Sequence, residues 1–213
     1  MPLFVPSASM CGNLSLNREA IYRPSSTLSP VVISSVTATK SREDQYGVIF
    51  SNGYHVSHQM LLSNGLKYDK DKSLCENLQK KRIGVVPGTT NEQAAKFLAQ
   101  KCNCGIEVKT NYKELIESKS ALFKGQVDLL QTDDIWLTGQ SNLASFQQFG
   151  PTLDESLSEF YSSEYGRSHE EYAIVTAKNG GDELMEIVND ILNSEQTKHF
   201  IEAIEVAARG HPF

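Results

Sequence analysis

The chain has 213 residues, of which 39% are hydrophobic, which is enough to bury a core in one large domain or two small ones. Twenty Lys and Arg residues stand against 26 Asp and Glu residues, so the formal net charge is −6 and no basic cluster favours nucleic-acid binding. The sequence contains no run of about 18 apolar residues, so we expect no membrane insertion.

The first 30 residues are rich in Ser, Pro and Asn and predict one short helix, at 17–22. The opening sequence MPLFVPSASMCG lacks the charged start and unbroken apolar stretch of a signal peptide. The four cysteines, at positions 11, 75, 102 and 104, match no zinc-binding spacing and no recurring disulfide framework. We therefore expect free thiols or a single disulfide, and the redox compartment stays open.

After residue 30 the sequence changes to short apolar runs separated by longer stretches. The run VVIS at 31–34 predicts a strand buried on both faces, and a second strand is expected at 59–62. The polar stretch 65–81 indicates a surface connection that contains a short helix at 74–78.

The middle of the chain alternates between strands and helices. The sequence RIGVV at 82–86 predicts a strand, and a helix at 91–101 follows, with Thr90 and Gln93 spaced as a capping box. A strand at 106–108, a helix at 112–124 and a strand at 127–131 come next. This alternation predicts an α/β fold, in which a parallel sheet has helices on both faces.

In the last third, a long loop rich in Ser and Glu is expected at 150–171, followed by a strand at 172–176. The next helix has apolar residues at i, i+3, i+4, i+7 and i+8, namely Leu184, Ile187, Val188, Ile191 and Leu192. A last helix is expected at 195–208, with Phe200, Ile201 and Ile204 facing inward.

Two segments place anion-binding groups at the end of a predicted strand, where ligands of α/β sheets bind. In VVISSVTATKSRED, the hydroxyls of Ser35 and Thr37 precede Arg42, whose guanidinium can bind a carboxylate through two parallel hydrogen bonds. In GVVPGTT, Thr89 and Thr90 stand at a helix start, where free amides favour an anion. Each segment also has a structural interpretation, as a polar strand exit with a surface arginine and as an ordinary helix cap.

A third segment, GQVDLLQTDD, ends its predicted strand in Asp133, a carboxylate that could bind an ammonium group. Its structural alternative is a helix cap, because Asp is also favoured there. Together the three segments suit a zwitterion. His55 and His58 are three residues apart in a stretch predicted to be extended, so we expect no metal site there. No serine stands in a nucleophile elbow, so we expect no catalytic residue.

In this order and spacing, the segments resemble the family 3 periplasmic solute-binding proteins. VVISSVTATKSRED, followed by FSNGY, is similar to that family's strand exit with its carboxylate-binding arginine. KRIGVVPGTTNEQ, GQVDLLQTD and YAIVTAKNGGDELMEIVNDIL are similar to three later elements of the family. The likeness covers about residues 30–208.

The resemblance implies a two-lobed type 2 periplasmic-binding fold that binds a free polar or charged amino acid for an ABC-type importer, without catalysis. Lobe 1 would comprise 1–60 and 172–213, and lobe 2 would comprise 61–171, with hinge strands near 59–62 and 172–176. Arg42 would bind the α-carboxylate, helped by Ser35, Thr37, Thr89 and Thr90, and Asp133 would bind the α-amino group. The family implies a periplasmic monomer that contacts a membrane permease and needs no cofactor.

The chain departs from the family at its start, where about 30 unlike residues stand in place of the first strands of lobe 1. We therefore expect the first lobe to be incomplete and the chain to be truncated at its N-terminus. The alternatives are a non-functional remnant, a ligand-sensing module, or an enzyme resembling cyclohexadienyl dehydratase, a relative of the same fold.

Overall fold

The computed structural model describes residues 31–135 and 146–210, so the helix expected at 17–22 lies outside the described residues. The described chain forms two compact units. Unit 1 contains 61–132 and 146–151, and unit 2 contains 31–60, 133–135 and 152–210. Within the described residues, no helix is both long enough and apolar enough to cross a bilayer.

Unit 1 is built on a five-stranded sheet in the order β5-β4-β6-β3-β7. Strand β4 is parallel to β5 and to β6, whereas β7 is antiparallel to β3. The strands are β3 (Gln59–Asn64), β4 (Arg82–Gly84), β5 (Glu107–Lys109), β6 (Leu129–Asp133) and β7 (Phe146–Gln148).

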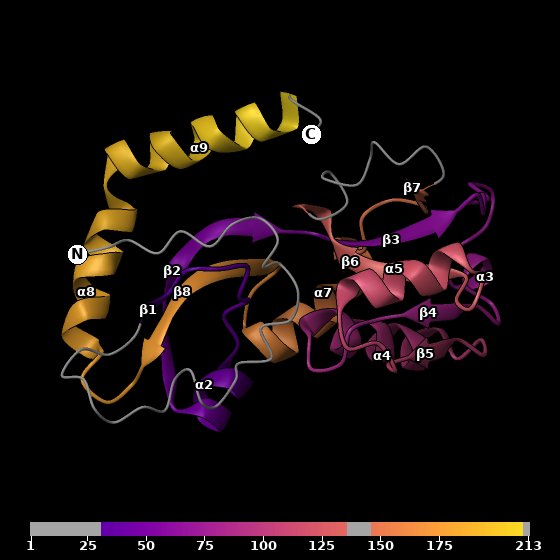
Figure 1. The fold of residues 1–213 in the computed structure, drawn as a ribbon, viewed down its shortest axis with the longest axis horizontal. Helices are drawn as coiled ribbons and strands as arrows, with labels where there is room; N and C mark the ends of the chain where they lie inside the picture. Colours follow the sequence, from indigo (N-terminus) through magenta and orange to yellow (C-terminus); the bar gives the residue numbers. More distant parts are fainter. Residues whose placement is uncertain (1–30, 136–145, 211–213) are drawn as a thin grey trace. The chain divides into compact units, whose positions relative to one another are not determined.

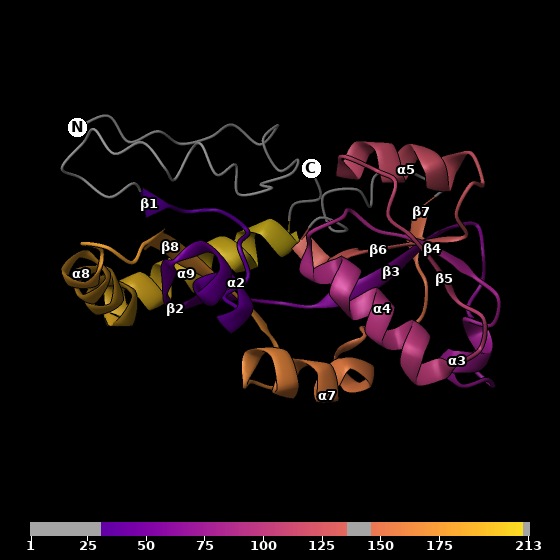
Figure 2. The same ribbon diagram turned by 90° about the horizontal axis from the view of Figure 1, so that it is seen from below.

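Three helices accompany this sheet: α3 (Leu74–Asn77), α4 (Thr90–Cys102) and α5 (Leu115–Phe123). The chain goes from β4 through α4 to β5 on one side, then returns through α5 to β6 on the other side of β4. Because such crossovers are right-handed, the reversal puts the two helices on opposite faces. Figure 2 shows α5 on one face of the sheet and α4 on the other.

The predicted alternation of strands and helices is confirmed in unit 1, with ends that differ by up to three residues. The strand expected at 82–86 ends at Gly84, and the helix expected at 112–124 begins at Leu115. The short helix near 74–78 is present as α3. Strand β7 was not predicted, because it has only three residues and pairs on one side.

Unit 2 contains a three-stranded antiparallel sheet in the order β1-β8-β2. The strands are β1 (Val31–Val32), β2 (Val48–Ser57) and β8 (Glu170–Ala177). The helices are α2 (Lys40–Tyr46), α7 (Asp154–Tyr165), α8 (Asp182–Asn193) and α9 (Glu195–Gly210). Strand β8 is central, so its backbone is hydrogen-bonded on both edges, and Figure 1 shows β2 and β8 curving together beside α8.

Two expectations for unit 2 are wrong, and two of its elements were not predicted. The strand at 31–34 is a two-residue edge strand rather than a strand buried on both faces, and Val31 is 40% exposed. The loop expected at 150–171 contains α7, whose Leu157, Phe160 and Tyr161 are buried. The serines between these apolar residues made the segment look like a loop in the sequence. Helix α2 and the long strand β2 were not predicted as such.

Helices α8 and α9 form where the sequence predicts them, but their apolar faces are not covered as expected. Ile187 and Ile191 of α8 are 53% and 56% exposed, and Phe200 and Ile204 of α9 are 66% and 52% exposed. Met185 is the residue of α8 that is buried. The amphipathic spacing therefore predicted both helices correctly, whereas the inward orientation expected for Phe200 and Ile204 is wrong.

The chain passes between the units inside β3, at the end of β6 and after residue 151. The first passage coincides with the hinge strand expected at 59–62. Strand β8 lies entirely in unit 2, and so does the segment 152–171, which the predicted boundary had put with 61–171. The full lobe boundaries, which include residues before 31, stay a prediction.

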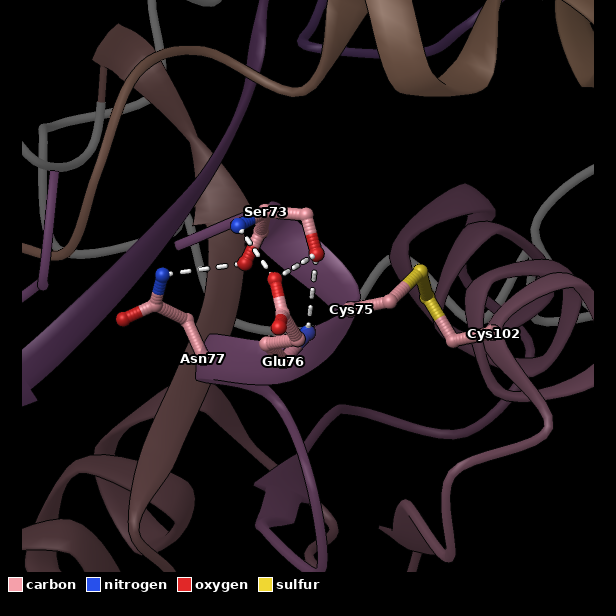
Figure 3. The surroundings of a disulfide bond; sticks show 5 residues. All are labelled: Ser73, Cys75, Glu76, Asn77 and Cys102. Atoms are coloured by element: carbon pink, nitrogen blue, oxygen red, sulfur yellow. Dashed lines mark hydrogen bonds between the residues drawn. A yellow bond between two sulfur atoms is a disulfide. The ribbon is translucent and has the colours of Figure 1, made fainter. Parts of the chain in front are cut away.

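One disulfide closes a loop within unit 1. Cys75 on α3 is bonded to Cys102 in the last turn of α4, 27 residues later, whereas Cys104 is a free thiol. Figure 3 shows that α3 begins with a capping box, in which Ser73 and Glu76 satisfy each other's backbone amides. The disulfide therefore joins the start of α3 to the end of α4. Of the two outcomes expected from the sequence, free thiols or a single disulfide, the described cysteines show the disulfide.

We expect that replacing both bonded cysteines, Cys75→Ser with Cys102→Ser, lowers the free energy of unfolding by about 3.5 kcal/mol, the loop-closure entropy of a 27-residue loop. Urea denaturation measures this loss, and adding a reductant to the wild type should reproduce it. Cys104→Ser is the control and should change stability little. A reductant effect that persists in the double variant would contradict this assignment.

Helix α8 offers a matched pair of substitutions. Met185 is 5% exposed and Ile191 is 56% exposed. Met185→Ala should cost about 2–3 kcal/mol because it empties a packed position. Ile191→Ala should change stability by roughly 0.5 kcal/mol or less, since surface substitutions usually do. Thermal and urea unfolding compare the two, and equal losses would show that Ile191 is covered in solution.

Candidate functional site

Residues 36–38 of unit 2 run antiparallel to the start of β8. The N–H of Ala38 donates to the carbonyl of Glu171 at 3.1 Å, and the N–H of Ala173 donates to the carbonyl of Val36 at 3.0 Å. Between these bonds, Thr37 and Tyr172 face each other as an isolated bridge. The backbone of Thr37 is thereby fixed against the central strand of the sheet.

Arg42 reaches back to this bridge from the first turn of α2. Thr39 caps that helix, since its hydroxyl accepts from the N–H of Arg42 at 3.1 Å. The Arg42 Nη1 donates to the carbonyl of Thr37 at 2.8 Å. This is the one hydrogen bond that its side chain makes to the described residues, so most of its five N–H donors can still serve a ligand.

Asp133 is held by the other residue of the bridge. It is the last residue of β6, and its Oδ2 accepts from the hydroxyl of Tyr172 at 2.6 Å. The same hydroxyl accepts from Ser57 Oγ at 3.1 Å. Burial, with the charge of Asp133, raises the pKa of Tyr172 well above its usual value, so the phenol stays protonated and keeps donating to the carboxylate.

The Thr37–Tyr172 bridge therefore holds a guanidinium on one side and a carboxylate on the other. Tyr165 of α7 responds to both of these charges. Burial raises its pKa above the usual value, the charge of Glu170 adds to the rise, and Arg42 and Asp133 act in opposite directions. Three of the predicted ligand-binding residues, Thr37, Arg42 and Asp133, are thus gathered in unit 2.

Neighbouring polar residues have other roles. Asp134 is fixed by backbone groups, since its Oδ1 accepts from the N–H of Ile135 at 2.9 Å and from that of His58 at 3.3 Å. Ser35 is exposed. The two histidines pair with carboxylates instead of with each other: His55 with Glu205 at 2.6 Å and His58 with Asp154 at 2.8 Å.

Thr89 and Thr90 lie in unit 1, at the end of β4 and the start of α4. The predicted capping box is wrong by one residue, because the N-cap is Thr89 and not Thr90. The Thr89 hydroxyl accepts from the N–H of Glu92 at 3.2 Å and donates to the carbonyl of Val86 at 2.7 Å. Glu92 in turn accepts from the N–H of Gly88 at 2.7 Å. Thr90 is the first helical residue and is 5% exposed.

Sequence reasoning missed Tyr172, Ser57 and Glu170. Tyr172 opens the strand predicted at 172–176, so its alternation with Ile174 and Thr176 indicates a shared face, but nothing local indicates Asp133 as its partner. Glu170 lies in the stretch 150–171, which was predicted to be a loop. These contacts join residues 39 to 133 positions apart in the chain, which spacing does not reveal.

Solved structures similar to this one are amino-acid-binding proteins. An ancestral arginine-binding protein bound to arginine is 29% identical, with a TM-score of 0.58 over 80% of this chain and 69% of that one. An ancestral arginine-binding protein bound to glutamine is 28% identical, with a TM-score of 0.59 over 81% and 68%. The substrate-binding protein of an amino acid ABC transporter is 19% identical, with a TM-score of 0.62 over 85% and 71%.

The chain has the fold of an amino-acid substrate-binding protein. This finding confirms the resemblance inferred from the sequence and the two-lobed α/β fold class. No protein-family profile and no curated protein sequence matches the chain.

The Thr89 hydroxyl both caps α4 and donates to the carbonyl of Val86. Thr89→Ala removes the capping hydroxyl and should lower the free energy of unfolding by about 1 kcal/mol. Thr89→Ser keeps the hydroxyl and should retain most of that stability. Urea denaturation of the two variants tests the assignment, and equal losses would mean that the methyl group, rather than the cap, carries the effect.

Proposed function

We propose that the chain binds a free polar or charged amino acid, unchanged, for delivery to an ABC-type importer. The observation that carries this proposal is the Thr37–Tyr172 bridge, which fixes Arg42 and Asp133 from its two sides. A free amino acid carries a carboxylate and an ammonium group on the same carbon. A site for it therefore needs a cation and an anion held close together.

In this proposal, Arg42 binds the α-carboxylate through the guanidinium N–H groups that Thr37 leaves available, and Asp133 binds the α-ammonium group. Thr37 and Ser35 supply further polar groups from unit 2. Unit 1 contributes the start of α4 at Thr89 and Thr90, where backbone amides and the helix dipole favour an anion.

The ligand preference proposed here follows from the neighbours above 25% identity, whose structures hold arginine and glutamine. The proposed partner is a membrane permease, and the proposed compartment is the periplasm. The Cys75–Cys102 disulfide supports an oxidising compartment, because such bonds persist mainly outside the cytosol. We propose that the protein acts as a monomer without catalysis and without a cofactor.

Isothermal titration with the twenty common amino acids, beginning with arginine and glutamine, tests this function. We expect binding of at least one polar or charged amino acid. Arg42→Ala should weaken that binding by about 2–5 kcal/mol, since the ligand carboxylate loses its counter-charge. Arg167→Ala is the matched control, because Arg167 pairs with Glu171 and is not assigned to the site.

A wild-type protein that is folded and binds none of the amino acids would contradict the proposal. Incubation with prephenate or arogenate addresses the enzymatic alternative. Conversion of either compound by the wild type would show that the site catalyses a reaction rather than only holding its ligand.

A further inference from the structure

Glu170 is a fully buried carboxylate at the start of β8. Its Oε1 accepts from the hydroxyl of Thr37, and its Oε2 accepts from the Nε2 of Gln59 at 2.8 Å. Burying a carboxylate costs several kcal/mol unless hydrogen bonds replace the lost water. A side chain of this kind is retained in a core only if its partners satisfy it or if it has a role.

We propose that Glu170 is the positioning residue for Arg42. Thr37 connects the two: its hydroxyl donates to the Glu170 carboxylate, and its carbonyl accepts from the Arg42 guanidinium at 2.8 Å. The ligand-binding consequence rests on the proposed function, whereas the effect on the Arg42 side chain does not. Glu170 does not contact Arg42 in this assignment and acts through the position of the Thr37 backbone.

The geometry favours a carboxylate over its amide at this position. Both oxygens of Glu170 face donors, one from Thr37 and one from Gln59. A glutamine would replace one of these oxygens with an N–H2 group. If that group faced Gln59, two donors would meet, and if it faced Thr37, the Thr37 hydroxyl would have to turn and accept, which leaves its own hydrogen without the Glu170 acceptor. Thr37 is 3% exposed, so no solvent can take over the role of a lost acceptor without a shift of the chain.

Such a shift reaches Arg42 directly. Residues 36–38 pair with β8 through two backbone hydrogen bonds, and the Thr37 carbonyl that holds Arg42 lies between them. Moving Thr37 away from Glu170 therefore moves the acceptor of the Arg42 side chain. The guanidinium then loses its fixed orientation even though its charge and its backbone position in α2 are unchanged.

Phenylglyoxal, a reagent for guanidinium groups, tests whether Glu170 positions the Arg42 side chain, and the test needs no ligand. The full chain is treated as wild type and as Glu170→Gln, and peptide mass spectrometry follows Arg42 and Arg82 separately. Arg82 is the internal control, because it pairs with Asp128 in the other unit at 2.8 Å. We expect Arg42 to react roughly three to ten times faster in the variant, the effect of one lost hydrogen bond, with Arg82 unchanged.

An unchanged rate at Arg42 in a folded Glu170→Gln protein would overturn the assignment. Equal acceleration of Arg42 and Arg82 would overturn it as well, because it would show that Glu170 only supports the fold. Thr37→Val is the second variant in case Glu170→Gln does not fold. It removes the connecting hydroxyl at nearly constant volume and should accelerate Arg42 in the same selective way.

The second arm measures affinity for L-arginine and L-glutamine in the same variants. Glu170→Gln should weaken wild-type binding of either ligand roughly tenfold. If the wild type binds neither amino acid, nor any other, the proposed function fails while the phenylglyoxal result stands by itself. If binding is present and Glu170→Gln leaves both the affinity and the Arg42 rate unchanged, the positioning role is wrong and the proposed function survives.

Discussion

The pairing of residues 36–38 with the start of β8 is the constraint on which the rest of unit 2 depends. Strand β8 lies between β1 and β2, so its backbone groups are committed on both edges and its side chains alternate between two faces. Glu170 and Tyr172 share one face because they are two residues apart. That periodicity brings a carboxylate and a phenol to the same polar cluster, where one reaches Thr37 and the other reaches Asp133.

The interior of unit 2 is polar where the site residues meet. Glu170, Thr37, Ser57 and Gln59 are all buried, and burial raises the pKa values of Tyr161, Tyr165 and Tyr172. An apolar cluster of the same shape would be as stable or more stable, since buried charges rarely repay their desolvation. A buried hydrogen-bond network of this kind fixes the positions of its side chains rather than adding stability. A binding site for a small zwitterion requires side chains held in fixed positions.

The sequence predicted elements well where one kind of periodicity ran without interruption. The strand at 82–86, the helix after it and the helix at 182–193 have patterns that no neighbouring residue disturbs. Strand β2 was missed because its register shifts around Gly53, so inward and outward residues do not alternate evenly. Helix α7 was missed because serines and glutamates surround Leu157, Phe160 and Tyr161, which nonetheless lie at helical spacing.

Contacts between distant segments set the limit of sequence reasoning at the site. The hydrogen bond between Arg42 and Thr37 is local, because the two residues are five positions apart in one sequence motif. Glu170 was not, because a glutamate in a polar stretch gives no indication that it will be buried against Thr37, 133 residues earlier.

Helix α9 is linked to the buried polar cluster through His55, which pairs with Glu205 of α9 at 2.6 Å and whose ring centre lies 5.5 Å from that of Tyr172. The cluster itself draws its residues from the segment 37–59 and from β6, α7 and β8, and its hydrogen bonds join Thr37, Arg42, Ser57, Gln59, Asp133, Glu170 and Tyr172. Unit 1 has its own sheet and its own disulfide. The positions of Arg42 and Asp133 therefore depend first on whether β8 keeps its pairing with residues 36–38.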